Sequence, residues 1–315
     1  MRQASVRLAA RARLALAGAT RQLVPFLTGG EAIGALQPEF AAELRDWPQV
    51  FSFDASGVSL ARGLDDPARR SARLAQVARE LEGRGRISGW RGETYAVYGG
   101  AQGALLFHLE RAAVRRFGLL ARAAHANVTT GSGNALRMWI ARRSASKPID
   151  PGMLDNLVGG GIASGARPFD TLVKEAKEEA GIEPARAARA RYVKMLLVER
   201  EVAEGLHREI LYVYDLEVAP GFRPRNLDGE VAAFERVDRA GLAARVAHGG
   251  FTVDAGLVAL DWLLRSARRP RPEPGWRRLA LTVARSERLA AGCGPTPRGL
   301  RPLLESPIPS GEHSQ

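Results

Sequence analysis

Apolar positions recur at helical spacing between residues 160 and 182, which is the clearest periodic pattern in the chain. Pro168 suits the first turn of a helix, because its missing N–H is not needed there, and Gly181 suits the residue that ends one. The pattern therefore predicts one amphipathic helix that follows a glycine loop and packs on a core by one face. The core-facing side chains are Phe169, Leu172, Val173, Ala176 and Ala180.

Shorter patterns on either side of this helix predict an α/β protein. Alternating or β-branched runs predict strands at 50–53, 58–60, 90–98, 104–107, 134–143, 157–158, 191–199, 209–218 and 230–234. Start and stop signals predict helices at 66–81, 110–117, 238–247, 253–265 and 278–289. Residues 31–115 form a small α+β unit in this scheme, and the larger unit follows it.

Composition narrows the class of protein. The chain has 315 residues with 45% hydrophobic content, which is enough for a globular protein with a sizeable core. The single cysteine, Cys293, excludes an intramolecular disulfide and gives no zinc-type ligand set. No apolar run is long enough to span a membrane, so we expect no membrane partner.

The net charge of +12 is concentrated at the two ends of the chain. Residues 1–30 hold five Arg and no acid, and residues 265–315 hold ten Arg against four Glu, so the ends carry eleven of the twelve charges. A body close to neutral argues against a nucleic-acid surface built into the fold. We therefore expect no specific nucleic-acid partner.

Residues 1–24 are rich in Arg and Ala, contain no acid and have an amphipathic helical pattern. This composition is typical of a mitochondrial transit peptide. It is equally typical of a first helix in this chain, because Ala and Arg are abundant throughout, and we favour that reading. We expect a cytoplasmic protein, or a mitochondrial one if residues 1–24 are a transit peptide.

Three carboxylates share another side of the 160–182 helix. Glu175, Glu178 and Glu179 are neighbours there because positions three and four apart lie together, and Lys174 flanks them. Such carboxylates repel one another unless a hard divalent cation lies among their oxygens. The alternative is a solvated Glu-rich face, which the spacing alone does not exclude.

The stretch resembles the Nudix box, G-x5-E-x7-R-E-U-x-E-E-x-G-U, where U is aliphatic. Ala166 and Lys174 stand where the family has Glu and Arg, which predicts reduced activity. The resemblance implies an α/β/α sandwich with a mixed sheet that cleaves a diphosphate bond with Mg²⁺ or Mn²⁺ held by Glu175, Glu178 and Glu179. The matching positions are Gly160, Glu175, Ala176, Glu178, Glu179, Gly181 and Ile182.

Further segments resemble one Nudix subgroup, described as thiamine-pyrophosphokinase-related, with its uncharacterised N-terminal domain. They are GWRGETYAVY, LERAAVRRFGLLARAAHAN, PGMLDN and DGEV. The resemblance implies a smaller α+β domain at 1–120, a Nudix domain at 121–267 and an Arg/Pro-rich, poorly ordered tail at 268–315. It also implies thiamine diphosphate or its oxidised analogues as small-molecule substrate, with nucleoside diphosphate sugars or dinucleotides as alternatives.

The resemblance also implies roles for single residues. Gly160 and Gly161 let the backbone approach a diphosphate, because they lack side chains. Arg91 and Asn127 are candidate substrate contacts, although strand-face packing explains such residues equally well. Glu230 is a candidate metal ligand or base, or an exposed turn carboxylate. The proton acceptor is one of Glu178, Glu179 and Glu230, and the sequence does not choose among them.

Two other classes of function remain open. The same fold carries isopentenyl diphosphate isomerase chemistry, which needs an active-site cysteine, whereas Cys293 lies in the expected tail. A non-catalytic diphosphate-binding module is the other, motivated by Ala166 and Lys174. Lys174 keeps the positive charge of the family's arginine but not its planar fork, so it orients the glutamates less tightly.

Overall fold

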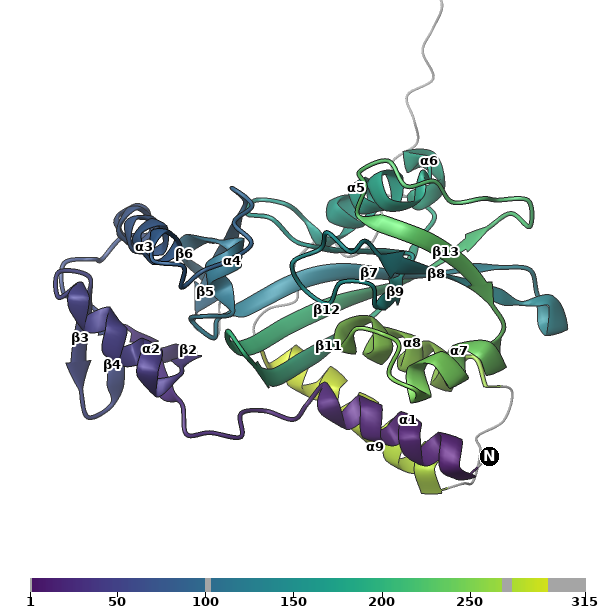
Figure 1. The fold of residues 1–315 in the computed structure, drawn as a ribbon, viewed down its shortest axis with the longest axis horizontal. Coiled ribbons are helices and arrows are strands. Elements are labelled where there is room, and N and C mark those ends of the chain that lie inside the picture. The colour runs from purple at the N-terminus through teal and green to yellow at the C-terminus, as the bar shows by residue number, and fades with distance from the viewer. Residues whose placement is uncertain (1, 100–102, 268–273, 294–315) are drawn as a thin grey trace, which may run out of the picture.

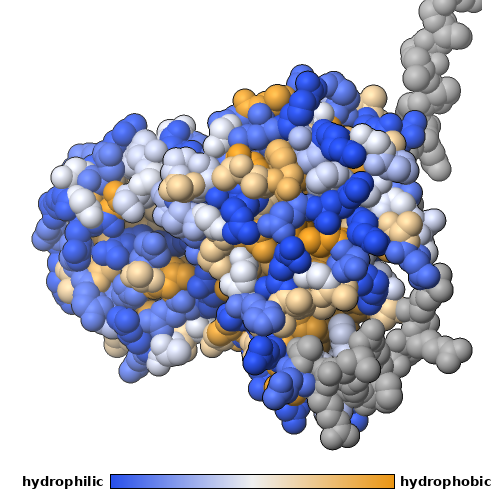
Figure 2. Space-filling view, turned by 45° about the vertical axis from the view of Figure 1, so that its right-hand side comes forward, coloured by the Kyte–Doolittle hydropathy of each residue, from blue (hydrophilic) through white to orange (hydrophobic). Residues whose placement is uncertain are grey.

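The computed structural model describes residues 2–99, 103–267 and 274–293. The chain forms two lobes, a smaller N-terminal α+β domain and a larger α/β domain (Figure 1). On the face shown in Figure 2, hydrophobic residues lie in small groups among hydrophilic ones. None of the helices in the described ranges has both the length and the apolar character that crossing a membrane requires.

The N-terminal domain packs helices on a four-stranded sheet and on a separate hairpin. The sheet has the order β2-β1-β4-β3, and its core contains four phenylalanine rings with centroids 5.1 to 6.3 Å apart. The elements are β1 (Val24–Thr28), β2 (Glu31–Leu36), α2 (Pro38–Glu43), η1 (Leu44–Asp46), β3 (Phe51–Asp54), β4 (Gly57–Leu60), α3 (Pro67–Gly83), β5 (Thr94–Gly99), β6 (Ala104–Glu110) and α4 (Arg111–Val114).

The larger domain is built on a mixed sheet in which five strands follow the order β11-β12-β7-β8-β13. Strand β10 pairs with β7 and β9 with β8, and β12 runs parallel to β7 while the other pairs are antiparallel. The elements are β7 (Leu120–Thr130), η2 (Gly133–Ala135), β8 (Arg137–Arg143), β9 (Leu154–Asn156), β10 (Val158–Gly161), β11 (Arg191–Val202), β12 (Gly205–Val218) and β13 (Val231–Val237).

Helices cover both faces of this sheet (Figure 1). Helices α5 (Pro168–Ala180) and α6 (Pro184–Ala187) lie on one face, and α7 (Arg239–Ala247) and α8 (Val253–Arg265) lie on the other. The result is an α/β/α sandwich with a smaller α+β domain before it. The predicted fold class is confirmed.

Helix α5 is the helix that the apolar pattern predicts. Pro168 is its first residue, and Leu172, Ala176 and Ala180 are buried against the sheet. Gly181 ends it with φ of 63°, a left-handed conformation that favours glycine, and its N–H donates to the carbonyl of Lys177 at 2.9 Å. These local signals were all present in the sequence.

Helix α1 (Arg2–Leu14) packs with the larger domain rather than with the N-terminal one. Leu8, Ala12 and Ala15 are at most 1% exposed and belong to the core of the sheet face that α7 and α8 cover. The expected boundary of 1–120 for the N-terminal domain is therefore wrong at its start. The expectation of a first helix in residues 1–24 is confirmed.

Helix α9 (Pro274–Gly292) corrects the expectation of a poorly ordered tail at 268–315. It lies beside α1 and against β11, because Leu279, Val283 and Ala290 form a buried stripe at helical spacing. The Arg- and Pro-rich composition on either side concealed this stripe. Residues 268–273 and 294–315 lie outside the described residues.

The two domains meet around the loop between β10 and α5. The N–H of Ser164 donates to the carbonyl of Thr94 at 2.8 Å, which fixes the β5–β6 hairpin on that loop. A Cβ atom at Gly161 would clash with the hydroxyl of Tyr95, so this close approach requires glycine. The N-terminal domain is therefore a fixed wall beside the glycine loop.

Candidate active site

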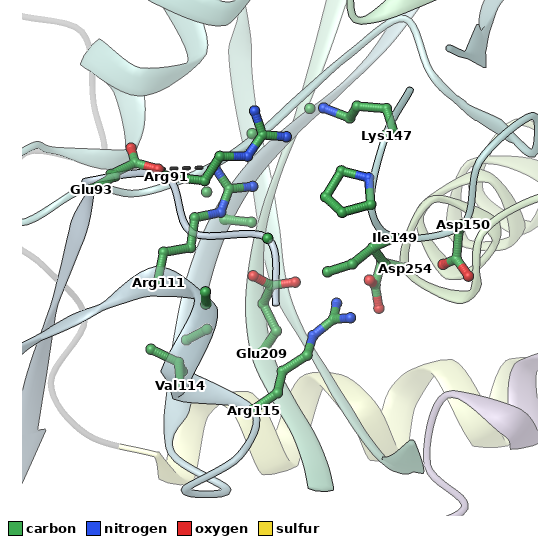
Figure 3. A pocket seen from close by; sticks show the side chains of 18 of the residues that line it. Arg91, Glu93, Arg111, Val114, Arg115, Lys147, Ile149, Asp150, Glu209 and Asp254 are labelled. Atoms are coloured by element: carbon green, nitrogen blue, oxygen red, sulfur yellow. Dashed lines mark hydrogen bonds and ion pairs between the residues drawn. The ribbon is translucent and has the colours of Figure 1, made fainter. Parts of the chain in front are cut away.

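A cavity of about 500 Å³ lies between the two domains. Its lining includes the glycines of β10, the glutamates Glu175 and Glu178 of α5, and arginines of the N-terminal domain. Figure 3 shows Arg91 and Arg111 reaching in from the N-terminal domain, with Lys147, Glu209 and Asp254 facing them from the larger domain. Carboxylates and cations from distant parts of the chain therefore share one space.

The glycine loop makes room for the carboxylates of α5. A Cβ atom at Gly160 would lie 2.5 Å from Cδ of Glu175, so a larger residue would displace that side chain. The N–H of Gly159 donates to Oε2 of Glu179 at 2.9 Å, and Glu179 is only 8% exposed. The loop thus holds both side chains in place.

The electrostatics of this site fit a divalent cation. Burial raises the pKa of Glu175, and Lys174 offsets this only in part. Burial, followed by the charge of Glu175, raises the pKa of Glu179 well above its ordinary value. Desolvated, mutually repelling carboxylate oxygens are the donors that Mg²⁺ accepts, and its charge relieves both effects.

Lys174 lies between two of the glutamates. Its Nζ donates to Oε1 of Glu175 at 3.1 Å and to Oε2 of Glu178 at 2.7 Å. Burial alone would lower the pKa of Lys174, but these two carboxylates raise it above the ordinary value. Lys174 therefore supplies the positive charge expected of the family's arginine, and it competes with a metal ion for Glu178.

Glu230, directly before β13, is held by cations from both domains. Its Oε1 accepts from Nη1 of Arg91 at 3.3 Å, and its Oε2 accepts from Nζ of Lys147. Burial acts to raise the pKa of Glu230, but Lys147 and then Arg91 lower it below its ordinary value. Arg91 and Glu230 thus lie together at the cavity, as the sequence predicts, and Lys147 is a third member that it missed.

Comparison with known proteins decides the family. The family model described as "NUDIX domain" matches residues 119–254, and "Domain of unknown function (DUF4743)" matches residues 6–121. Nudix hydrolase 24, chloroplastic, of Arabidopsis thaliana is 35% identical over 258 residues, which cover 81% of this chain and 71% of that protein. The chain belongs to the Nudix hydrolase family. It is therefore an enzyme of a family that acts on diphosphate bonds.

Two further relatives match both domains of this Nudix hydrolase. Nudix hydrolase 20, chloroplastic, of Arabidopsis thaliana is 34% identical over 254 residues, covering 78% of this chain and 68% of that protein. An uncharacterised protein of Saccharomyces cerevisiae is 27% identical over 255 residues, covering 75% of this chain and 74% of that protein. Each aligned stretch is too long to be the Nudix domain alone.

Asn127 does not join the site of this Nudix hydrolase. It is buried on β7, and its Nδ2 donates to Oδ1 of Asp215 at 3.0 Å. Asp215 is in turn paired with Nη1 of Arg265 at 2.6 Å. Asn127 is not among the residues that line the cavity. Its predicted substrate contact is therefore replaced by a structural role at the end of α8.

Neighbours of the predicted residues also have structural partners. The Trp90 ring lies 3.9 Å from the guanidinium of Arg79, which is a packing contact on α3. His125 lines the cavity, but its Nδ1 lies 2.9 Å from Oδ1 of Asn156. Glu93 holds Nη1 of Arg111 at 2.9 Å and so positions a cavity arginine.

The sequence missed a second polar group in the cavity of this Nudix hydrolase. His207 and Glu209 lie on β12, and Asp254 lies in the first turn of α8. Burial acts to raise the pKa of Asp254, but His207, and then the charges of Arg115 and Arg200, hold it well below its ordinary range. No local motif marks these residues, because two separate elements bring them together.

Proposed function

We propose that this Nudix hydrolase cleaves an organic diphosphate to the monophosphate in the cavity between its domains. The observation that supports this is the shared lining: Glu175 and Glu178 of α5 face the same space as Arg91, Arg111 and Lys147. The carboxylates suit Mg²⁺ or Mn²⁺, and the cations suit the phosphate oxygens. Glu175, Glu178 and Glu179 are the proposed metal ligands.

The cation supplies charge neutralisation of the diphosphate and a bound water of lowered pKa. The protein's own residues orient the reactants. Arg91 and Lys147 present donors to the phosphate oxygens, and Glu230 positions both of them rather than accepting a proton, since its carboxylate is already paired. Glu178 lines the cavity and its side chain is 42% exposed, so we assign it as the proton acceptor.

The proposed substrate is thiamine diphosphate or one of its oxidised analogues. The support for it is the likeness of GWRGETYAVY, PGMLDN and DGEV to the thiamine-pyrophosphokinase-related subgroup. The cavity also has apolar side chains, Val114 and Ile149, beside the aromatic Tyr95, and these suit the ring part of an organic diphosphate. The phosphates would then lie toward α5.

A substrate screen tests the proposal. Purified protein is incubated with Mg²⁺ and with thiamine diphosphate, its oxidised analogues, nucleoside diphosphate sugars and dinucleotides, and monophosphate release is measured. We expect the highest kcat/KM for the thiamine compounds. A higher kcat/KM for a nucleotide substrate would overturn the thiamine assignment and leave the diphosphate chemistry intact.

A further inference from the structure

Three potential metal ligands meet at the end of the cavity away from the α5 glutamates. His207 and Glu209 are two residues apart on β12, so their side chains lie on the same face of the sheet. Asp254 approaches that face from the first turn of α8. His207 is 1% exposed, and the side chains of Glu209 and Asp254 are 13% and 15% exposed.

The ligand atoms have the spacing of a metal site. Nε2 of His207 lies 3.1 Å from Oδ1 of Asp254 and 3.7 Å from Oε2 of Glu209. All three ligand atoms lie within 4.8 Å of one another. Ligands bound to Zn²⁺ at about 2.0–2.2 Å in tetrahedral geometry are roughly 3.3 Å apart, so little movement is needed to close on an ion.

The geometry points to a second divalent-cation site in this protein, formed by His207, Glu209 and Asp254 and suited to Zn²⁺ or a similar transition metal. An imidazole nitrogen with two carboxylates favours such ions over Mg²⁺, which prefers oxygen ligands. Three protein ligands beside a cavity leave a coordination position open to solvent or to a bound molecule. This site does not depend on the proposed substrate.

The second site is better preorganised than the first. Within the part of the chain that the structure describes, it is the one set of three His, Cys, Asp or Glu ligand atoms that lie within 4.8 Å of one another. The α5 glutamates do not form such a set, and Lys174 holds two of them. The two sites thus differ in donor type as well as in position.

A purely structural hydrogen bond between His207 and Asp254 leaves Glu209 unexplained. The ion pair that Glu209 makes within the described ranges is the loose one to His207, at 3.7 Å. Its carboxylate nevertheless faces the cavity from a largely buried position (Figure 3). A carboxylate in that environment is stabilised by a cation, and a metal ion would engage all three side chains at once.

Arg115 lies at the same end of the cavity (Figure 3), and its charge acts on Asp254. A bound metal ion would feel that charge as a repulsion. The inferred site therefore predicts that removing the guanidinium strengthens metal binding, whereas a purely structural role for Asp254 predicts no such effect.

Zn²⁺ binding to the full chain tests the site. The protein is stripped with a chelator, dialysed into buffer with excess Mg²⁺ to fill the α5 site, and titrated with Zn²⁺ by calorimetry. We expect one equivalent of Zn²⁺ to bind, with affinity reduced about tenfold or more in Glu209→Gln and in Asp254→Asn, and increased in Arg115→Gln. Asp150→Asn, which removes another cavity carboxylate, serves as the matched control and retains full affinity.

Thermal unfolding of each variant without metal shows whether it is folded. If Asp254→Asn does not fold, Glu209→Gln together with Arg115→Gln still decides the question. Glu178→Gln separates the two sites, because it removes an α5 ligand and should leave Zn²⁺ binding unchanged. No Zn²⁺ binding by the wild type, or equal affinity in the wild type and Glu209→Gln, would overturn the inference.

Discussion

Arg91 of the N-terminal domain donates a hydrogen bond to Glu230 of the Nudix domain at 3.3 Å. The two residues are 139 positions apart in the chain. Their side chains are about one-third exposed, so the pair itself adds little to stability. Its importance lies in where it holds a guanidinium, at the edge of a cavity whose other wall contains the α5 glutamates.

Arg91→Ala tests the contribution of the N-terminal domain to the substrate site. The change removes a charge-assisted hydrogen bond to phosphate, worth about 1.5–3 kcal/mol, so kcat/KM should fall roughly tenfold to a hundredfold with folding unchanged. Steady-state kinetics measures this. Arg73→Ala, on the exposed face of α3, is the control and should behave as the wild type. Equal kinetics for the two variants would show that Arg91 does not contact substrate.

Lys174→Arg tests the departure from the family pattern. An arginine fork can hold Glu175 and Glu178 with fixed geometry, where the ammonium of Lys174 makes two single contacts. We expect kcat to rise several-fold at saturating Mg²⁺. Lys177→Arg, one turn away on the same helix, should leave kcat unchanged. A fall in kcat for Lys174→Arg would mean that the lysine is the better partner here.

The raised pKa values of Glu175 and Glu179 predict how stability depends on pH without metal. A carboxyl whose pKa is raised on folding stabilises the protein below its unfolded pKa, and this is lost as pH rises through the folded value. Metal-free protein should therefore gain stability as pH falls from about 7 toward about 5. Asp254 opposes this only at lower pH, since its pKa is depressed.

Thermal unfolding with a chelator, measured at several pH values, shows that gain. Glu179→Gln should reduce it, because the amide keeps an acceptor for the N–H of Gly159 but does not titrate. Mg²⁺ should stabilise the wild type most at neutral pH, where the carboxylates are ionised. A pH dependence that is the same in Glu179→Gln and in the wild type would contradict the assignment of these shifts.

Helix α1 should be required for stability of the Nudix domain. Leu8 is 1% exposed among residues of α9 and α8, so Leu8→Ala should cost about 2–5 kcal/mol of unfolding free energy. Val6 on the same helix is 53% exposed, and Val6→Ala should change stability by about 0.5 kcal/mol or less. Urea unfolding of both variants provides the measurement. Equal midpoints would show that α1 is not docked in solution.

The sequence predicts best where the signals are local. Helix α5, its proline start and its Gly181 end all lie within one short stretch, so pattern and structure agree. Strand β7 was missed because it is buried on both faces, and its run of small residues shows no alternation. Helix 110–117 was predicted too long, since only 111–114 form α4 before the chain turns into β7.

The active site was predictable only on its Nudix-box side. Glu175, Glu178 and Glu179 lie on one helix, so their proximity follows from helical geometry. The Arg91–Glu230 pair and the His207–Asp254 pair join separate elements, and no spacing rule reaches across them. Asn127 shows the reverse error, since a resemblance suggested a substrate contact where β7 and α8 supply a structural partner.

The central claim is that the α5 carboxylates form the metal-dependent hydrolytic centre of the cavity. Mg²⁺-dependent monophosphate release by Glu178→Gln, compared with Glu183→Gln on the exposed loop after α5, tests it most directly. We predict that Glu178→Gln loses at least about a hundredfold in kcat while remaining folded, and that Glu183→Gln retains wild-type kcat. Unchanged hydrolysis by folded Glu178→Gln would contradict the claim.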